Sequence, residues 1–86
     1  MENPIFKIEY SRTAVKVIES LDRKSKQRIK AAIEKIPNGD IKPLQGSSSL
    51  FRLRTGTLRI IFTYPDKSTV LIIKIGPRGD VYKGGL

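Results

Sequence analysis

Three short segments in the second half of the chain alternate apolar and polar side chains with the period of a β-strand, and this pattern constrains the fold most. The segments are residues 50–54, 58–64 and 69–75, of which the last is the most apolar and typical of a central strand. Thr55-Gly56 indicates a tight hairpin turn, and residues 65–68 turn the chain again. The sequence therefore predicts a three-stranded antiparallel meander. Its apolar face comprises Phe51, Leu53, Leu58, Ile60 and Phe62.

The N-terminal half combines one strand with two helices. Residues 5–10 alternate as a half-buried strand, and residues 37–49 have the proline, glycine and serine content of a loop. Between them, Ser11 and Asp22 are predicted helix N-caps, each followed by apolar side chains at helical spacing. The two stripes predict a helical hairpin whose apolar faces share one sheet. They comprise Ala14, Val17, Ile18 and Leu21, then Ile29, Ala32, Ile33 and Ile36.

The order strand, helix, helix, strand, strand, strand predicts an α+β domain, in which the helical hairpin covers one face of a mostly antiparallel sheet. A length of 86 residues suits a single domain over residues 1–86. The N-terminus lacks the pattern of a secretory signal, and the longest apolar run, residues 70–73, is far shorter than a membrane span. The absence of cysteine also fits the cytoplasm, where we expect the protein to reside.

The net charge of the chain limits the classes of partner that it is expected to bind. Its 17 Lys and Arg against 8 Asp and Glu give a net charge of +9, which favours nucleic acid, an anionic membrane surface or an acidic protein. Without histidine or cysteine, the chain is neither a nuclease with a histidine pair nor a Ser-His-Asp or Cys-His hydrolase. Asp40, Asp66 and Asp80 lie in predicted turns or the tail without metal-ligand spacing. We therefore expect no metal and no cofactor.

The alternation of side chains along a strand determines on which face of the meander each arginine lies. Because its apolar side chains turn toward the helices, Arg52, Arg54 and Arg59 share the face that no helix covers. A merely polar exposed face accounts for one or two arginines, but poorly for three within eight positions. A guanidinium fork suits phosphate, and several unpaired guanidiniums repel one another unless an anion is bound. Arg78 and Tyr82 follow the last strand and are expected to reach the same face.

The cations of the second helix are assigned first to the solvated surface and only second to RNA binding. They lie on its polar face near Glu19, Asp22 and Glu34, so a solvated surface is the first interpretation. The second is electrostatic steering toward RNA, which salt weakens. These cations are Arg23, Lys24, Lys26, Arg28, Lys30 and Lys35.

Several short motifs, in their order and spacing, resemble the RelE/ParE superfamily of bacterial toxins over nearly the whole chain. They are Leu-Phe-Arg-Leu-Arg at 50–54, Leu-Arg-Ile-Ile-Phe at 58–62 and Ile-Lys-Ile-Gly-Pro-Arg-Gly-Asp-Val-Tyr at 73–82. Residues 11–14, 21–22 and 41–46 also match the pattern. The resemblance implies a RelE-like α+β fold and the toxin of a type II toxin–antitoxin system.

The resemblance also implies an activity and partners. RelE-like members are ribosome-dependent endoribonucleases that cleave messenger RNA with the RNA's own 2′-hydroxyl as nucleophile and need no metal. The implied partners are the ribosome, messenger RNA and a cognate antitoxin protein, with operator DNA contacted only through the antitoxin and no membrane. A basic site that must be masked predicts an acidic segment in the antitoxin.

Individual roles follow from the same resemblance. Arg52 and Arg54 match positions that hold the RNA backbone and assist proton transfer. Arg59 matches the arginine that stabilises the charged phosphorane, and Arg78 matches a basic residue that assists at the phosphate. Tyr82 matches a tyrosine that orients or stacks on a base. The predicted catalytic set is Arg54, Arg59, Arg78 and Tyr82, and the predicted RNA-binding set is Arg52, Arg54, Lys74 and Lys83.

Two departures from the family pattern bear on proton transfer. Pro77 replaces a frequent histidine, and the arginines at 52 and 54 replace lysines of well-known members. Because arginine stays protonated, the general base is left open between Tyr82, a ribosomal group, and catalysis by positioning and charge stabilisation alone. Two other functions also stay open: a ParE-like toxin that poisons DNA gyrase, and a non-catalytic or decayed toxin that only binds antitoxin or RNA.

Overall fold

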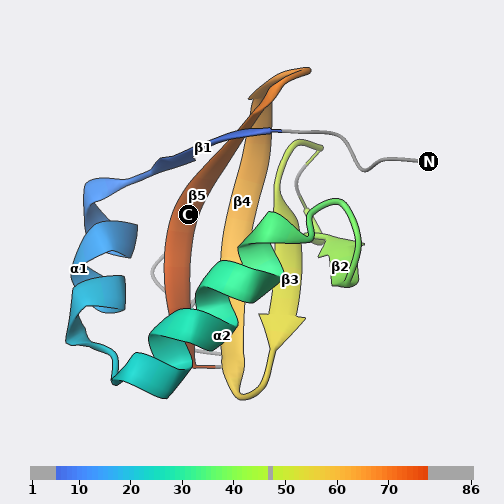
Figure 1. The fold of residues 1–86 in the computed structure, drawn as a ribbon. Coiled ribbons are helices and arrows are strands. Elements are labelled where there is room, and N and C mark those ends of the chain that lie inside the picture. Colours follow the sequence, from blue (N-terminus) through green and yellow to red (C-terminus); the bar gives the residue numbers. More distant parts are fainter. Residues whose placement is uncertain (1–5, 47, 78–86) are drawn as a thin grey trace.

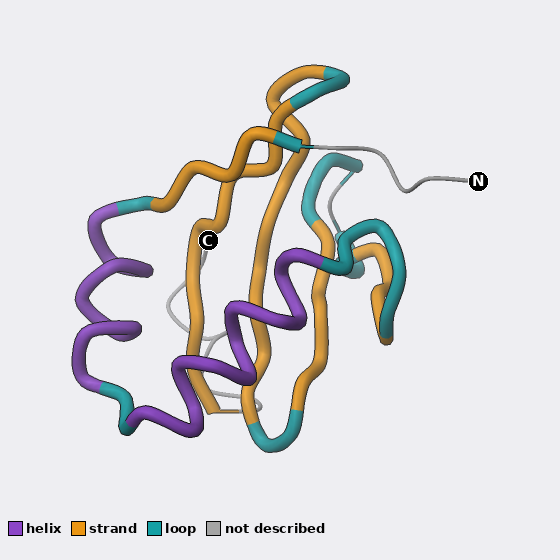
Figure 2. Tube along the Cα trace, in the orientation of Figure 1, coloured by secondary structure: helices purple, strands orange, loops and turns teal. Residues whose placement is uncertain are grey.

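The structure, a computed structural model, describes residues 6–46 and 48–77 of the chain. In this part of the chain, five strands form one mixed sheet in the order β1-β5-β4-β3-β2. Helix α2 crosses in front of the sheet and α1 lies beside β5 (Figures 1 and 2). Neither described helix is long and apolar enough to cross a membrane. The elements are β1 (Lys7–Tyr10), α1 (Arg12–Ser20), α2 (Arg23–Glu34), β2 (Asp40–Pro43), β3 (Phe51–Thr55), β4 (Leu58–Asp66) and β5 (Thr69–Pro77).

The sheet has one strand more than the sequence predicts. The predicted loop over residues 37–49 is wrong at Asp40–Pro43, where β2 pairs antiparallel with β3. The meander therefore has four strands, and β1 joins the opposite edge by pairing parallel to β5. Strand β5, predicted as a central strand, lies inside the sheet between β1 and β4, and β4 occupies the middle position. The predicted class, an α+β domain with a helical hairpin, is confirmed.

Both predicted helix N-caps are confirmed. The Oγ of Ser11 accepts a hydrogen bond from the N–H of Ala14 at 3.0 Å, and its hydroxyl donates to the carbonyl of Ile73 at 2.6 Å. At the start of α2, Asp22 Oδ2 accepts from the N–H of Ser25 at 3.2 Å. These bonds satisfy N–H groups that have no partner within a helix. The Ser11 hydroxyl also ties the start of α1 to β5.

The core lies between the helices and one face of the sheet. Ile60 and Phe62 of β4 are fully buried there, and Phe62 stacks on Phe51 with ring centroids 5.6 Å apart. Burying a side chain of this size stabilises the fold by about 1.5–3 kcal/mol. The predicted helix stripes supply the opposing layer, which places the strand faces that bear arginine on the other side. The other members of this buried cluster are Ala14, Ile29, Ile33, Ile36, Leu53, Val70, Ile72 and Ile75.

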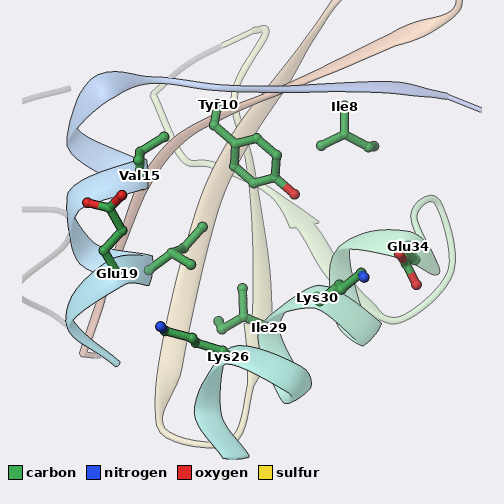
Figure 3. Close-up of a pocket in the computed structure, with 9 residues that line it drawn as sticks. Ile8, Tyr10, Val15, Glu19, Lys26, Ile29, Lys30 and Glu34 are labelled. Atoms are coloured by element: carbon green, nitrogen blue, oxygen red, sulfur yellow. The ribbon is translucent and has the colours of Figure 1, made fainter. Parts of the chain in front are cut away.

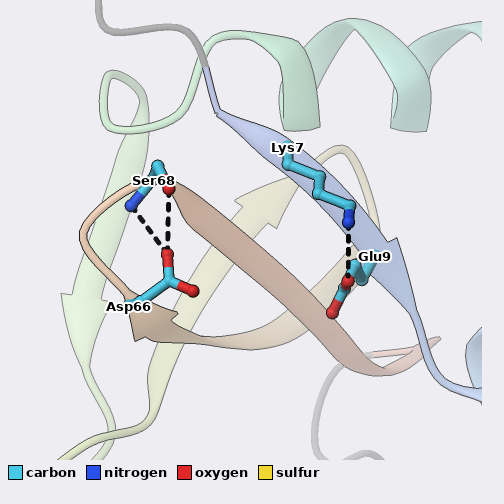
Figure 4. A network of polar contacts seen from close by, with 4 residues as sticks. All are labelled: Lys7, Glu9, Asp66 and Ser68. Carbon is cyan, nitrogen blue, oxygen red and sulfur yellow. Dashed lines mark hydrogen bonds and ion pairs between the residues drawn. The ribbon is translucent and has the colours of Figure 1, made fainter.

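A carboxylate holds the turn between β4 and β5. Strand β4 extends through Asp66, so the turn predicted over residues 65–68 is shorter than expected. Asp66 Oδ1 accepts hydrogen bonds from the N–H of Ser68 at 2.9 Å and from its hydroxyl at 3.1 Å (Figure 4). Figure 4 also shows the exposed pair of Lys7 and Glu9 on β1, whose charged atoms are 3.6 Å apart. An exposed pair of this kind stabilises little.

Asp22, the N-cap of α2, and Asp66, the acceptor in the β4–β5 turn, are expected to make the stability of the fold decrease in acid. Hydrogen bonds from Ser68 lower the pKa of Asp66, and hydrogen bonds from Ser25 lower the pKa of Asp22. A lowered folded-state pKa stabilises the fold above the unfolded value of about 3.9. That contribution is lost as the pH falls through the folded-state value.

We therefore expect the free energy of unfolding, measured by urea denaturation between about pH 5 and pH 2, to fall less steeply in Asp22→Ala/Asp66→Ala than in the wild type. A double variant with the full wild-type pH dependence would contradict this assignment.

Candidate functional site

The sheet face that turns away from the core presents two rows of side chains, which the strand register defines. The first row, across β2, β3, β4 and β5, is Asp40, Arg54, Arg59 and Gly76. The second row, across the same strands, is Lys42, Arg52, Ile61 and Lys74. We call these eight positions the arginine face. Five of them are cationic and one is acidic, so positive charge dominates.

In the first row, two guanidinium groups lie opposite each other. Arg54 and Arg59 are direct cross-strand partners, and like charges in such a pair destabilise a sheet. Arg54 Nε lies 3.6 Å from Asp40 Oδ2, but the two side chains are 50% and 47% exposed, so this pair stabilises little. Among the described residues, Arg59 has no acidic side chain in ion-pair contact. The row therefore contains more positive charge than it neutralises.

In the second row, one guanidinium nitrogen is buried without a partner. Within the described part of the chain, Arg52 Nη1 is shielded from solvent and has no hydrogen-bond acceptor. A buried donor left unsatisfied costs about 1–3 kcal/mol, and more when it is charged. Ile61, fully buried on this face, lies between Arg52 and Lys74, whose aliphatic stems are suited to cover it. Because Nη1 is shielded from solvent, an anion would supply the missing acceptor only once the Arg52 side chain turns outward.

The register brings part of the predicted site together. The predicted residues on the arginine face are Arg52, Arg54, Arg59 and Lys74. The others, Arg78, Tyr82 and Lys83, lie outside the described residues, and their roles stay predictions. The structure thus assembles the cations of the predicted site, and it does not test what they do.

Two charged residues of the arginine face are missed by the sequence prediction. Asp40 and Lys42 belong to β2, which was predicted as loop, so neither was assigned to the sheet. The available signal was the alternation of these two polar residues around Ile41, which is half-buried. Asp40 matters most, because its carboxylate competes with any anion for Arg54.

The arginine face suits a site for phosphate. Guanidinium forks bind phosphate oxygens in pairs, and preorganised cations stabilise charge that develops at a reacting phosphorus. The one carboxylate of the face, Asp40, is already paired with Arg54. No cluster of His, Cys, Asp or Glu suited to a metal ion occurs among the described residues. The face therefore can hold and polarise a phosphodiester but offers little for proton transfer.

A second surface lies on the opposite side of the sheet, between α1 and α2. This groove has a volume of about 530 Å³, and its lining includes Ile8 and Tyr10 from β1, Val15 from α1 and Ile29 from α2 (Figure 3). Two of these side chains, Tyr10 and Val15, are 40% and 39% exposed. Burial, and then the charge of Glu34, raise the pKa of Tyr10. The groove is an apolar surface without a covering element among the described residues.

The same fold occurs in solved toxin–antitoxin complexes. The chain is similar to a chain of the archaeal RelE–RelB complex from Pyrococcus horikoshii OT3, with 26% identity, a TM-score of 0.66, and 86% of this chain and 96% of that chain covered. It is also similar to a chain of the RelBE2 complex from Mycobacterium tuberculosis, with 21% identity, a TM-score of 0.72 and coverage of 86% and 99%. For a chain of the RelB–RelE complex from Methanococcus jannaschii, the identity is 23% and the TM-score is 0.70, and 86% of this chain and 94% of that chain are covered. The fold is therefore RelE-like.

The family follows from the sequence. The model of the family described as "ParE toxin of type II toxin-antitoxin system, parDE" matches residues 8–82. The chain belongs to this family and is a toxin of the RelE/ParE superfamily, which confirms the resemblance predicted from its motifs. No curated protein sequence matches it.

Arg52→Met tests whether the buried, unpaired Nη1 destabilises the free protein and favours phosphate binding. Methionine keeps an unbranched apolar stem and removes a buried charge, so we expect the free energy of unfolding to rise by about 1 kcal/mol. Inorganic phosphate should raise the melting temperature of the wild type more than that of the variant, because a ligand of the folded state alone stabilises it. Lys67→Met, in an exposed turn, is the control. A destabilised Arg52→Met protein with a wild-type response to phosphate would contradict this interpretation.

Proposed function

We propose that this toxin is a metal-independent endoribonuclease that acts in the cytoplasm, cleaves messenger RNA on the ribosome, and is neutralised by a cognate antitoxin. The observation behind the proposal is the arginine face, where Arg52, Arg54 and Arg59 lie side by side with too little carboxylate to neutralise them. An RNA backbone matches this arrangement, because it presents a regular series of phosphate charges to neighbouring cations.

In the proposed reaction, the RNA supplies its own nucleophile. The 2′-oxygen attacks the adjacent phosphorus and the P–O5′ bond breaks, which leaves a 2′,3′-cyclic phosphate and a 5′-hydroxyl. One proton leaves the 2′-hydroxyl for a base, and one is delivered to the departing 5′-oxygen. We assign Arg59, half-buried on β4, to the negative charge that develops on the phosphorane. Arg52 and Arg54 hold the flanking phosphate oxygens.

Charge stabilisation is the main contribution expected of this face. Loss of one preorganised donor from such a site typically lowers kcat by about 10²–10³-fold. Because Asp40 is paired with Arg54, we do not assign it as the general base. Proton transfer is assigned instead to Tyr82 or to a group of the ribosome, with Arg78 assisting at the phosphate. Phosphate binding is thus assigned to the arginine face, and proton transfer to Tyr82 or the ribosome.

The proposed antitoxin is acidic and partly apolar. It must bind a chain of net charge +9, and complementary charge favours such a partner. The groove between α1 and α2 supports an additional apolar contact, because Tyr10 and Val15 are exposed there. An amphipathic segment with acidic residues on its outer side fits both features. The solved structures with this fold are themselves toxin–antitoxin complexes, which supports the proposal.

A second candidate function is inhibition of DNA gyrase without cleavage of RNA. The match to the ParE family model favours it, because the RelE/ParE superfamily includes gyrase poisons. The shared scaffold does not distinguish the two activities. They differ in what they damage, since a gyrase poison triggers the DNA-damage response and leaves messenger RNA intact.

Arg59→Ala tests the proposed function. We expect RNA cleavage to fall by about 10²–10³-fold and growth arrest to disappear, because the charge that develops on the phosphorane loses its partner. The fold should persist, since the core side chains of β4, Ile60 and Phe62, point to the opposite face. The measurement is a map of RNA 5′ ends after induced expression, with and without the neighbouring gene product, which should restore growth as the antitoxin.

Lys67→Ala is the matched control and should cleave like the wild type, because Lys67 lies in the exposed β4–β5 turn. Undiminished cleavage by Arg59→Ala would reject the proposed role of the arginine face. A DNA-damage response with intact messages in the wild type would instead establish the gyrase alternative.

A further inference from the structure

Helix α2 carries a concentration of positive charge that destabilises the helix. Arg23 and Lys24 occupy the first turn, where the helix dipole disfavours cations, and the turn itself contains no acidic residue, although the N-cap Asp22 precedes it. Lys24 and Arg28 are four residues apart, as are Lys26 and Lys30, a spacing at which like charges repel. In the described part of the chain, no carboxylate forms an ion pair with any of these side chains. The repulsion between these cations is unfavourable in the free protein, so a bound anionic ligand would reduce it.

Two cations of this region line a groove between α2 and the edge of the sheet. The groove has a volume of about 260 Å³, and Arg28, Lys35, Asp40 and Arg54 are among its lining residues. Gly56, in the turn between β3 and β4, has a φ of +59°, and a Cβ added to it would lie 3.1 Å from Arg28 Nη1. Glycine adopts this backbone conformation without a steric penalty and also leaves space for the guanidinium. The turn thus brings Arg28 close to the sheet.

Arg54 belongs to both basic surfaces. On the arginine face it lies directly opposite Arg59, and at the end of β3 it lines the groove together with Arg28 and Lys35. Figure 1 shows α2 running across the strands toward β3. The helix packs on the core side of the sheet, opposite the arginine face. Positive charge therefore continues from the middle strand, past the end of β3, onto the helix layer.

We propose that Arg28 and Lys35 form a second phosphate-binding site, and that an RNA strand held on the arginine face continues past Arg54 into this groove. The inference rests on the proposed function, because it adds a site for the flanking nucleotides of the same RNA. Each phosphate contact with a single strand adds about 0.7 to the slope of log K against log salt, so the two cations together add about 1.4.

The features around the groove favour RNA over a membrane or an acidic protein. The exposed apolar side chains that a membrane or protein contact would use, Tyr10 and Val15, line the other groove, on the α1 side of α2. A guanidinium and an ammonium that continue a series of arginines match the repeated charges of a nucleic acid backbone. A protein or membrane ligand is therefore expected at the other groove, and the RNA strand at Arg28 and Lys35.

The test compares two RNA lengths and two double variants. The probes are uncleavable 2′-O-methyl RNAs of about 4 and about 12 nucleotides, because the short one spans the arginine face alone. Arg28→Glu/Lys35→Glu is compared with Lys16→Glu/Lys67→Glu, which makes the same change in net charge at exposed positions outside both grooves. Binding is followed by fluorescence anisotropy over a range of salt, and circular dichroism verifies that each variant is folded.

We expect Arg28→Glu/Lys35→Glu to bind the long RNA at least about tenfold more weakly than the control variant, with a salt slope smaller by about 1.4. Both variants should bind the short RNA equally. Equal losses in the two variants, or equal losses for both RNA lengths, would overturn the second site and leave the proposed function intact. Conversely, a wild type that binds the long RNA through Arg28 and Lys35 but fails to cleave RNA would overturn the proposed function and leave the second site intact.

Asp40→Asn provides the converse test. Because Asp40 lines the same groove and pairs with Arg54, its charge competes with phosphate at the point where the two surfaces meet. We expect its removal to strengthen binding of the long RNA by about fivefold, which corresponds to a Coulomb energy of about 1 kcal/mol at such a distance in water. Unchanged or weaker binding would argue against a strand that passes Arg54.

Discussion

The pairing of β4 with β5 is the interaction on which both the core and the positions of Arg59 and Lys74 depend. Ile60 lies opposite Ile75, and beyond a one-residue irregularity between Ile61 and Phe62, Phe62 lies opposite Ile72; all four side chains are buried. A shift by one residue would turn this apolar set toward the other face, at the cost of the core. Because strand side chains alternate, the same register directs Arg59 away from the helices. The position of the cations is thus a consequence of core formation.

The arginine face is costly for the free protein, and that cost indicates a ligand. Arg54 and Arg59 are paired across neighbouring strands, and Arg52 Nη1 is buried without an acceptor among the described residues. Each feature alone is unfavourable by an amount that is appreciable for a domain of this size. A phosphate backbone would relieve both at once, because it brings negative charge and acceptor oxygens together. The same reasoning extends to the basic residues of α2, which an anion would also stabilise.

Strong periodicity made most of the fold predictable from the sequence. The helices and three strands of the meander followed from their apolar spacing, but Asp40–Pro43 did not, because this strand is short and contains turn-forming residues. Alternation also does not encode the direction of a partner strand, so the parallel pairing of β1 was not predictable. In the site, alternation placed Arg52, Arg54 and Arg59 on one face. The burial of Arg52 Nη1 and the approach of Arg28 to the β3–β4 turn depend on packing, which local sequence does not specify.

The central claim is that the arginine face binds an RNA backbone, and the guanidinium signals of that face report on it directly. The measurement is an NMR titration of the wild-type protein with an uncleavable RNA of about four nucleotides, which follows the arginine Nε–H resonances and the backbone amides. Binding to the arginine face predicts shifts for Arg52 and Arg59 and none for Val15, which lies across the sheet in the groove between the helices. Shifts confined to that groove, with the resonances of Arg52 and Arg59 unchanged, would contradict the account.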